Sequence, residues 1–117
     1  MKLPNGDRAI VDIVKLRDYC LNPRHMYGRH KARVFRSMLG FDRSRAEELR
    51  HILMQVAASD DAQLGDEDDF GQRYVIDFPL DAAAGTATVR SCWIVLRDEN
   101  VPRLTSCFVV TKGQAKP

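Results

Sequence analysis

The stretch TATVRSCWIVL, Thr86–Leu96, is a long segment with the residue pattern of a β-strand. Its residues alternate, so Arg90 and Cys92 are predicted to face one side of the strand and Ser91 and Trp93 the other. This segment is therefore predicted to be a strand of a β-sheet.

The segments around Thr86–Leu96 predict an antiparallel β-meander. Shorter strands are predicted at Tyr74–Phe78 and Leu104–Val110. Turn residues separate the three strands, at Pro79–Gly85 and at Asp98–Pro102. The C-terminal part of the chain is therefore predicted to form a sheet of at least three strands.

The N-terminal half has apolar residues at helical spacing instead, which predicts three helices. Helix caps and helix-breaking residues mark their ends. The first runs from Asp12 to the stop at Asn22–Pro23, and the second from His30 to Leu39, before Gly40. The third begins at Asp42 or Ser44 and runs through Ala57, and Ser44 matches a capping box with Glu47.

Helices followed by an antiparallel meander predict an α+β fold, with the N-terminal helices packed on the C-terminal sheet. A chain of 117 residues is long enough for one core but not for two, so we expect a single domain, 1–117. Its predicted parts are a helical region at about 10–58, an acidic connector at 59–71, a β-meander at 72–111 and a frayed tail at 112–117.

The composition argues against a membrane, metal or disulfide protein. Met1–Ala9 has no apolar core of a signal peptide, and no window approaches a membrane span. The three cysteines form no CxxC pair, and the histidines and cysteines lack ligand spacing. We expect a cytoplasmic protein with no membrane partner, no metal site and no cofactor.

Charge is distributed unevenly along the chain. Residues 1–58 hold 12 Lys or Arg and 6 acids, whereas residues 59–81 hold one Arg and 8 acids. Residues 82–117 are basic again, with 5 Lys or Arg and 2 acids. This pattern suggests a polyanionic partner that contacts one face of the protein.

The most basic stretch is LNPRHMYGRHKARVF, Leu21–Phe35, which lies between the first two predicted helices and contains no carboxylate. His25 on this turn could act as a general acid or base near neutral pH. Lys31 and Arg33 begin the next predicted helix, where free backbone N–H groups favour an anion. The turn is either a solvated bend or a phosphate-handling site.

Three residues of the predicted sheet also allow two interpretations. Arg90 is either in an ion pair with Asp77 or another acid, or a clamp for a phosphate. Trp93 is either a core residue or a platform for a base. Thr105, followed by Ser106, is either an ordinary strand hydroxyl or a hydrogen-bond partner of a phosphate.

Four segments, KLRDYCLNPRH, GRHKARVF, TVRSCWIV and PRLTSCFV, resemble an uncharacterised bacterial family of small standalone proteins and C-terminal modules of polymorphic toxins. The resemblance extends from about Leu3 to Val110, and Met26 stands where the family has proline. Such modules are similar to the barnase–EndoU–colicin–RelE class of RNases. The resemblance implies an α+β fold and places the functional positions at His25, Lys31, Arg90, Thr105 and Trp93.

Residues and resemblance together predict a ribonuclease-like toxin of a toxin–antitoxin pair, which cleaves RNA by acid–base chemistry and is neutralised by a cognate antitoxin. The alternatives are a non-catalytic antitoxin or immunity-type binding module, suggested by the acidic connector, and a nucleic-acid-binding regulator. The predicted catalytic residues are His25, Lys31, Arg90 and Thr105, and the predicted RNA contacts are Arg24, Arg29, Arg33, Trp93 and Arg103.

Overall fold

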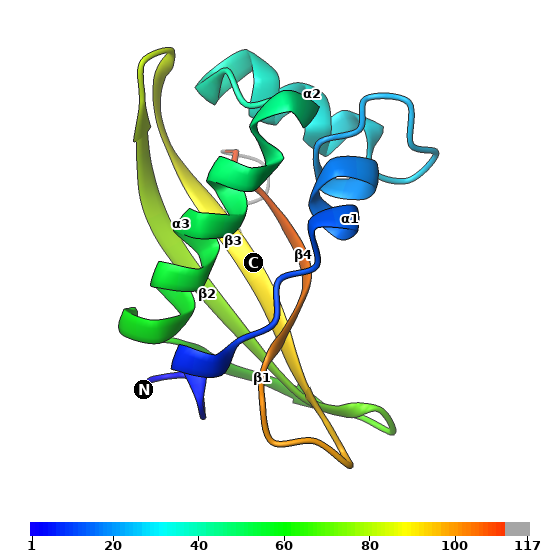
Figure 1. Ribbon diagram of the computed structural model, residues 1–117, viewed down its shortest axis with the longest axis vertical. Coiled ribbons are helices and arrows are strands. Elements are labelled where there is room, and N and C mark those ends of the chain that lie inside the picture. Colours follow the sequence, from blue (N-terminus) through cyan, green and yellow to red (C-terminus); the bar gives the residue numbers. More distant parts are fainter. Residues whose placement is uncertain (112–117) are drawn as a thin grey trace.

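The computed structural model of the protein describes residues 1–111, and its helical elements all precede its strands (Figure 1). The tail predicted at 112–117 lies outside the described residues. The helical elements are η1 (Gly6–Arg8), α1 (Ile13–Lys15), η2 (Leu16–Cys20), α2 (Arg29–Leu39), η3 (Arg43–Arg45) and α3 (Ala46–Ser59). The strands are β1 (Gln63–Glu67), β2 (Gly71–Ala82), β3 (Gly85–Leu96) and β4 (Arg103–Val109).

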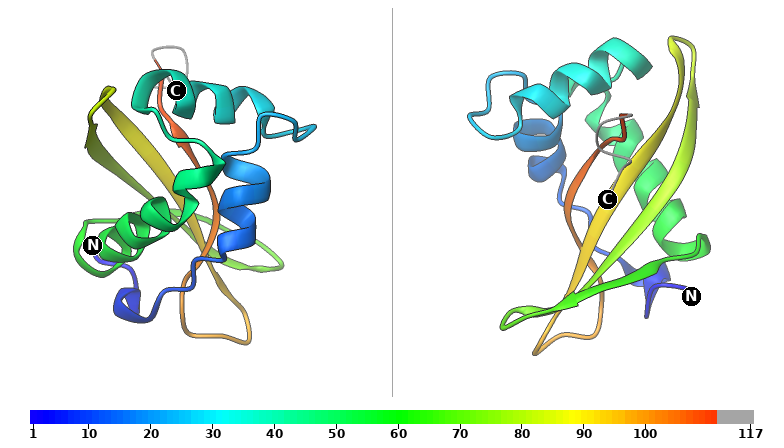
Figure 2. Two further views of the ribbon diagram at one scale, coloured as in Figure 1. Left: turned by 45° about the horizontal axis from the view of Figure 1, so that its top comes forward. Right: turned by 180° about the vertical axis from the view of Figure 1, so that it is seen from behind.

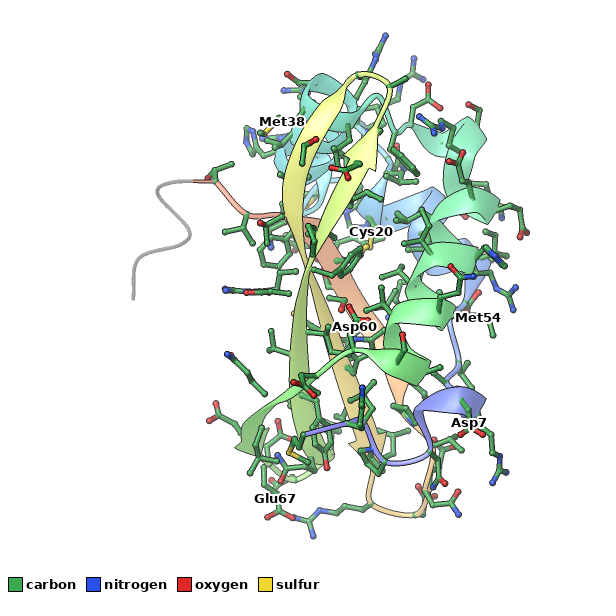
Figure 3. The ribbon with its side chains drawn as sticks, turned by 90° about the vertical axis from the view of Figure 1, so that its left-hand side faces the viewer. Asp7, Cys20, Met38, Met54, Asp60 and Glu67 are labelled. Carbon is green, nitrogen blue, oxygen red and sulfur yellow. The ribbon has the colours of Figure 1, made fainter. Side chains whose placement is uncertain are left out.

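The four strands form one antiparallel sheet in the order β1-β2-β3-β4, so each strand pairs with its neighbour in sequence. The helices pack on one face of this sheet and leave the other face uncovered, as the side view and the view from behind show (Figures 2 and 3). The prediction of an α+β fold with a C-terminal β-meander is confirmed.

The core lies between the helical layer and β3. As predicted, Ser91 and Trp93 face one side of the strand and Arg90 and Cys92 the other. The structure shows that the first two are buried and the other two only half-buried. The Trp93 indole N–H donates a hydrogen bond of 2.9 Å to Ser91 Oγ. Ser91 in turn donates one of 2.9 Å to the carbonyl oxygen of Ile76, so both polar groups are satisfied within the core.

Two helix caps form as predicted and one does not. Asp12 Oδ1 accepts the Val14 backbone N–H at 2.9 Å, and Gly40 ends α2 with a φ of 70°. The capping box of Ser44 with Glu47 is wrong. Asp42 Oδ1 accepts the Ser44 N–H at 2.9 Å, which places Ser44 inside η3 and leaves its hydroxyl bonded to Asp42.

The segment predicted as an acidic connector, 59–71, contains a strand that the sequence did not predict, β1. All five residues of β1 are exposed, so the segment has no apolar alternation that would reveal a strand. The turn predicted at Pro79–Gly85 is shorter than expected, since β2 continues to Ala82. Pro79 is tolerated there because, among residues 1–111, β2 at this point pairs with β3 alone.

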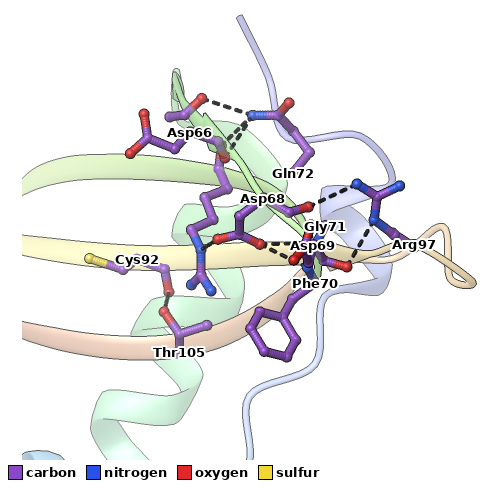
Figure 4. Close-up of polar contacts among 11 residues, drawn as sticks. Asp66, Asp68, Asp69, Phe70, Gly71, Gln72, Cys92, Arg97 and Thr105 are labelled. Carbon is purple, nitrogen blue, oxygen red and sulfur yellow. Dashed lines mark hydrogen bonds and ion pairs between the residues drawn. The ribbon is translucent and has the colours of Figure 1, made fainter.

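The β1–β2 turn is held by the carboxylate of Asp68 (Figure 4). Its Oδ1 accepts the N–H groups of Phe70 at 2.9 Å and Gly71 at 3.3 Å, and its Oδ2 accepts Arg73 Nε–H at 2.7 Å. The hydrogen bond from Arg73, followed by that from the Phe70 N–H, holds the pKa of Asp68 below its ordinary value of 3.8.

This lowered pKa predicts an acid-sensitive turn. A carboxylate whose pKa is lower in the folded state stabilises the fold above its unfolded pKa, and this contribution is lost as pH falls through the folded value. We expect the wild-type unfolding free energy to fall more than that of Asp68→Asn between about pH 5 and pH 2, measured by urea denaturation. Equal falls would show that Asp68 is not a source of the pH dependence.

Candidate functional site

The uncovered face of the sheet carries a groove of about 490 Å³. All four strands contribute to it, and Tyr19 of η2 and Lys31 of α2 close its end beside β4. Its lining residues are Tyr19, Lys31, Gly65, Asp66, Arg73, Tyr74, Val75, Cys92, Trp93, Thr105, Ser106 and Phe108.

Lys31 is the cation that the helical layer contributes to this groove. It lies in the first turn of α2, which packs along β4, and its side chain is half-buried. Its Nζ lies 4.2 Å from the centroid of the Phe108 ring, a cation–π contact that fixes the ammonium over the sheet. The structure thus places this sequence-predicted residue in the groove.

Arg90 lies beside the groove, between its register partners Asp77 on β2 and Phe108 on β4. Two parallel hydrogen bonds join it to Asp77, from Nε to Oδ1 at 2.8 Å and from Nη2 to Oδ2 at 2.9 Å. The predicted ion pair is therefore confirmed. The Asp77 carboxylate raises the pKa of the Arg90 guanidinium, and about a third of the Arg90 side chain is exposed. Arg90 is a fixed cation with part of its surface open to a ligand.

Thr105 reaches the groove at an irregularity in β4, where the pairing with β3 shifts its register. Its hydroxyl donates a hydrogen bond of 3.1 Å to the Cys92 carbonyl oxygen (Figure 4), which leaves the oxygen lone pairs as acceptors. Burial raises the pKa of the Cys92 thiol, and the charges of Arg90 and Lys31 oppose this effect. The two cations therefore act on the same part of the groove as Thr105.

His25 does not line the groove. Its Nδ1 accepts hydrogen bonds from the backbone N–H groups of Tyr27 and Gly28, both at 3.1 Å. Its ring meets Tyr19 edge-on, with 4.8 Å between the ring centroids. His25 therefore closes the turn before α2 through Nδ1 and lies against a ring that lines the groove.

His25 can either hold the turn before α2 or act as the predicted general acid or base. Two substitutions distinguish these roles. Asparagine can offer Oδ1 where histidine offers Nδ1, as Asp68 does for the N–H groups two and three residues ahead of it. If the groove cleaves RNA, as the sequence predicts, His25→Asn should keep the rate of cleavage within about threefold and His25→Ala should lower it by about tenfold. Equal loss in both variants would instead indicate that the imidazole takes part in the chemistry.

Of the five predicted RNA contacts, only Trp93 is among the residues that line the groove. Arg24, Arg29 and Arg33 are exposed around the turn and along α2, and none lines it. Arg103 is bound to Glu99 through two hydrogen bonds of 2.7 and 2.8 Å. The interpretation of Trp93 as a base platform is wrong, because its side chain is 1% exposed and its N–H is bonded within the core.

Tyr19, Asp66, Arg73 and Phe108 are among the groove residues that were not predicted from the sequence. Tyr19 and Phe108 occupy apolar positions of a helix and a strand, which gives no sign that they reach an open face. Asp66 lies in the segment predicted as a connector, and only the pairing of β1 with β2 brings it to the groove. Alternation along β2 places Arg73 and Val75 on one face of the sheet. This alternation is the sequence feature from which Arg73 could have been predicted.

Residues 1–111 contain neither a metal-ligand cluster nor a helix that could span a membrane. No three His, Cys, Asp or Glu side chains in this range are grouped to hold a metal ion. None of its helices has the length and apolar character that a membrane span requires.

Comparison with known proteins identifies a family. No curated protein and no solved structure matches the chain. A family model described as a domain of unknown function, DUF6883, matches residues 2–111. The match covers nearly the whole chain, and the protein therefore belongs to the DUF6883 family.

Proposed function

We propose that the groove binds single-stranded RNA and cleaves it without a metal ion, as a ribonuclease-like toxin would. The observation that supports this most is the meeting of Lys31, from α2, with Thr105, from β4, in one groove beside Arg90. A phosphodiester in this groove would lie between fixed cations and hydroxyl oxygens, which is the environment that phosphoryl transfer requires.

The proposed reaction is attack of the ribose 2′-OH on the adjacent phosphorus, with release of the 5′-OH of the next nucleotide and formation of a 2′,3′-cyclic phosphate. A base must take the 2′ proton and an acid must protonate the leaving oxygen. Lys31 and Arg90 would stabilise the charge that develops on the phosphoryl oxygens.

Asp66 is the groove's candidate base. Its exposed carboxylate has no hydrogen-bond or ion-pair partner within the described part of the chain, so it is free to accept the 2′ proton. In this proposal Thr105 orients the phosphate, a water molecule donates the proton to the leaving 5′ oxygen, and His25 and Tyr19 hold the end of the groove.

The direct test is incubation of purified protein with a labelled RNA, and with DNA of the same sequence, in excess EDTA. We expect the RNA to be cut to products with a 2′,3′-cyclic phosphate and the DNA to stay intact, because DNA has no 2′-OH. Intact RNA at equimolar protein, or equal cutting of DNA, would contradict the proposal.

A toxin of this kind would act in cells through RNA loss and would need a neutralising antitoxin. Induced expression in a bacterial host should stop growth and fragment total RNA, and His25→Ala should weaken both effects. The alternative function, a harmless antitoxin or immunity-type module, is favoured by the exposed acidic strand β1. Normal growth with intact RNA, together with protection against a neighbouring gene's toxic product, would support that alternative.

A further inference from the structure

β1 is an edge strand whose outer side is open. It pairs with β2 on one side, and no strand within residues 1–111 pairs along its other side. All five of its residues are exposed, and the β1–β2 hairpin projects beyond the helical layer (Figure 2). An exposed edge of this kind offers backbone N–H and C=O groups to another extended chain.

The chain's own N-terminus already pairs with the beginning of this edge. The Ala62 N–H donates a hydrogen bond to the Met1 carbonyl oxygen, and the Met1 ammonium lies 3.4 Å from the Ala62 carbonyl oxygen. Lys2 and Asp61 form an antiparallel bridge. Strand alternation directs the backbone groups of Leu64 to the same side as those of Ala62. Beyond Leu64 the strand is bulged, and the carbonyl oxygens of Gly65 and Asp66 accept hydrogen bonds from Gln72 Nε2 at 2.9 and 3.4 Å. The regular open edge that an antiparallel strand could join is therefore centred on Leu64.

The side chains along this edge define what such a strand must carry. Residues 59–71 contain six acids and no Lys or Arg, and the side chains of Leu64 and Phe70 are exposed among them, at 64% and 68%. Pairing of β1 with β1 of a second copy would bring Asp66 and Glu67 close to the same acids of the partner, which is unfavourable. A strand with basic and apolar residues is complementary.

We propose that the outer edge of β1 docks an extended, positively charged segment of a partner protein as an additional antiparallel strand. Its lysines or arginines would meet Asp66 and Glu67, and its apolar side chains would cover Leu64 and Phe70. Gly65 and Asp66 also line the groove, so the docked segment would stand at the groove wall. An effect on RNA cleavage depends on the proposed function, whereas docking itself does not.

The test is an NMR titration of isotope-labelled protein with a synthetic peptide of about ten alternating Lys and Val residues, long enough to span β1. Two peptides serve as controls, one with Glu in place of Lys and one with Pro in place of Val. We expect the Lys–Val peptide alone to bind, with the largest amide shifts at residues 63–67. Shifts elsewhere, or equal binding of either control peptide, would overturn the proposal.

A matched pair of variants tests the charge argument. Asp66→Lys with Glu67→Lys should weaken peptide binding by about tenfold or more. Asp7→Lys with Glu47→Lys makes the same change in net charge at two exposed acids outside the hairpin and should leave binding unchanged. Equal weakening in both double variants would overturn the proposal. Peptide docking without RNA cleavage would contradict the proposed function but not the edge-strand proposal. RNA cleavage without peptide docking would contradict the edge-strand proposal but not the proposed function.

Discussion

Replacement of Lys31 by alanine is expected to reduce RNA cleavage by about 100-fold or more, the effect of removing a charge aimed at a developing anion. The Lys31 ammonium is held over the Phe108 ring in the groove, so it needs little rearrangement to meet a phosphate. Its side chain is half-buried and outside the main core, so the variant should keep its fold. Initial rates on labelled RNA, with circular dichroism to verify folding, measure the effect.

Arg33→Ala is the matched control for this loss. Arg33 lies two residues after Lys31 on α2, about 200° around the helix axis, and is exposed away from the groove. Both variants remove one positive charge from the same helix, but only Lys31→Ala should lose activity. If Arg33→Ala loses as much activity as Lys31→Ala, general charge rather than the groove accounts for RNA handling.

Trp93→Ala is expected to have the largest effect on stability, about 3–5 kcal/mol of unfolding free energy. The indole is 1% exposed and lies in the core between β3 and the helices. Its loss leaves a cavity and also removes the hydrogen bond to Ser91. Because domains of this kind have only about 5–15 kcal/mol of stability, much of the protein should be unfolded at moderate urea concentration.

Urea denaturation of wild type, Trp93→Ala and Trp93→Phe measures the loss of unfolding free energy in each variant. Phenylalanine keeps most of the apolar ring and should cost less than alanine. A destabilisation below about 1 kcal/mol for Trp93→Ala would show that the ring is not packed in the core, and would restore its earlier interpretation as a base platform.

The sequence was sufficient for those parts of the fold that have one buried face. The alternation of β3 and the apolar spacing of α2 and α3 follow directly from burial against a shared core, so their residues reveal them. β1 could not be predicted, since it is exposed along its whole length and is a strand only because β2 extends beside it. The end of β2 could not be predicted either, because of Pro79. Whether a proline interrupts a strand depends on which neighbouring strands pair with it at that position.

The sequence was enough to select candidate site residues by their chemical type, but not to predict where their side chains point. Lys31 and Thr105 could be selected because cations and hydroxyls suit phosphate chemistry, and the structure brings both to one groove. His25 could be selected on the same grounds, yet its Nδ1 is occupied by the backbone of its own turn. The sequence gives no information on whether a turn histidine points outward or closes the turn.

The most direct test of an RNA-handling groove is an NMR titration with a 2′-O-methyl oligoribonucleotide, which keeps the phosphates but cannot be cleaved. We predict amide shifts at Lys31, Cys92 and Thr105, and binding that weakens with salt at a log–log slope of roughly −0.7 per phosphate contact. Shifts confined to the exposed side of α2 around Arg33, or no shifts, would contradict the assignment of the groove.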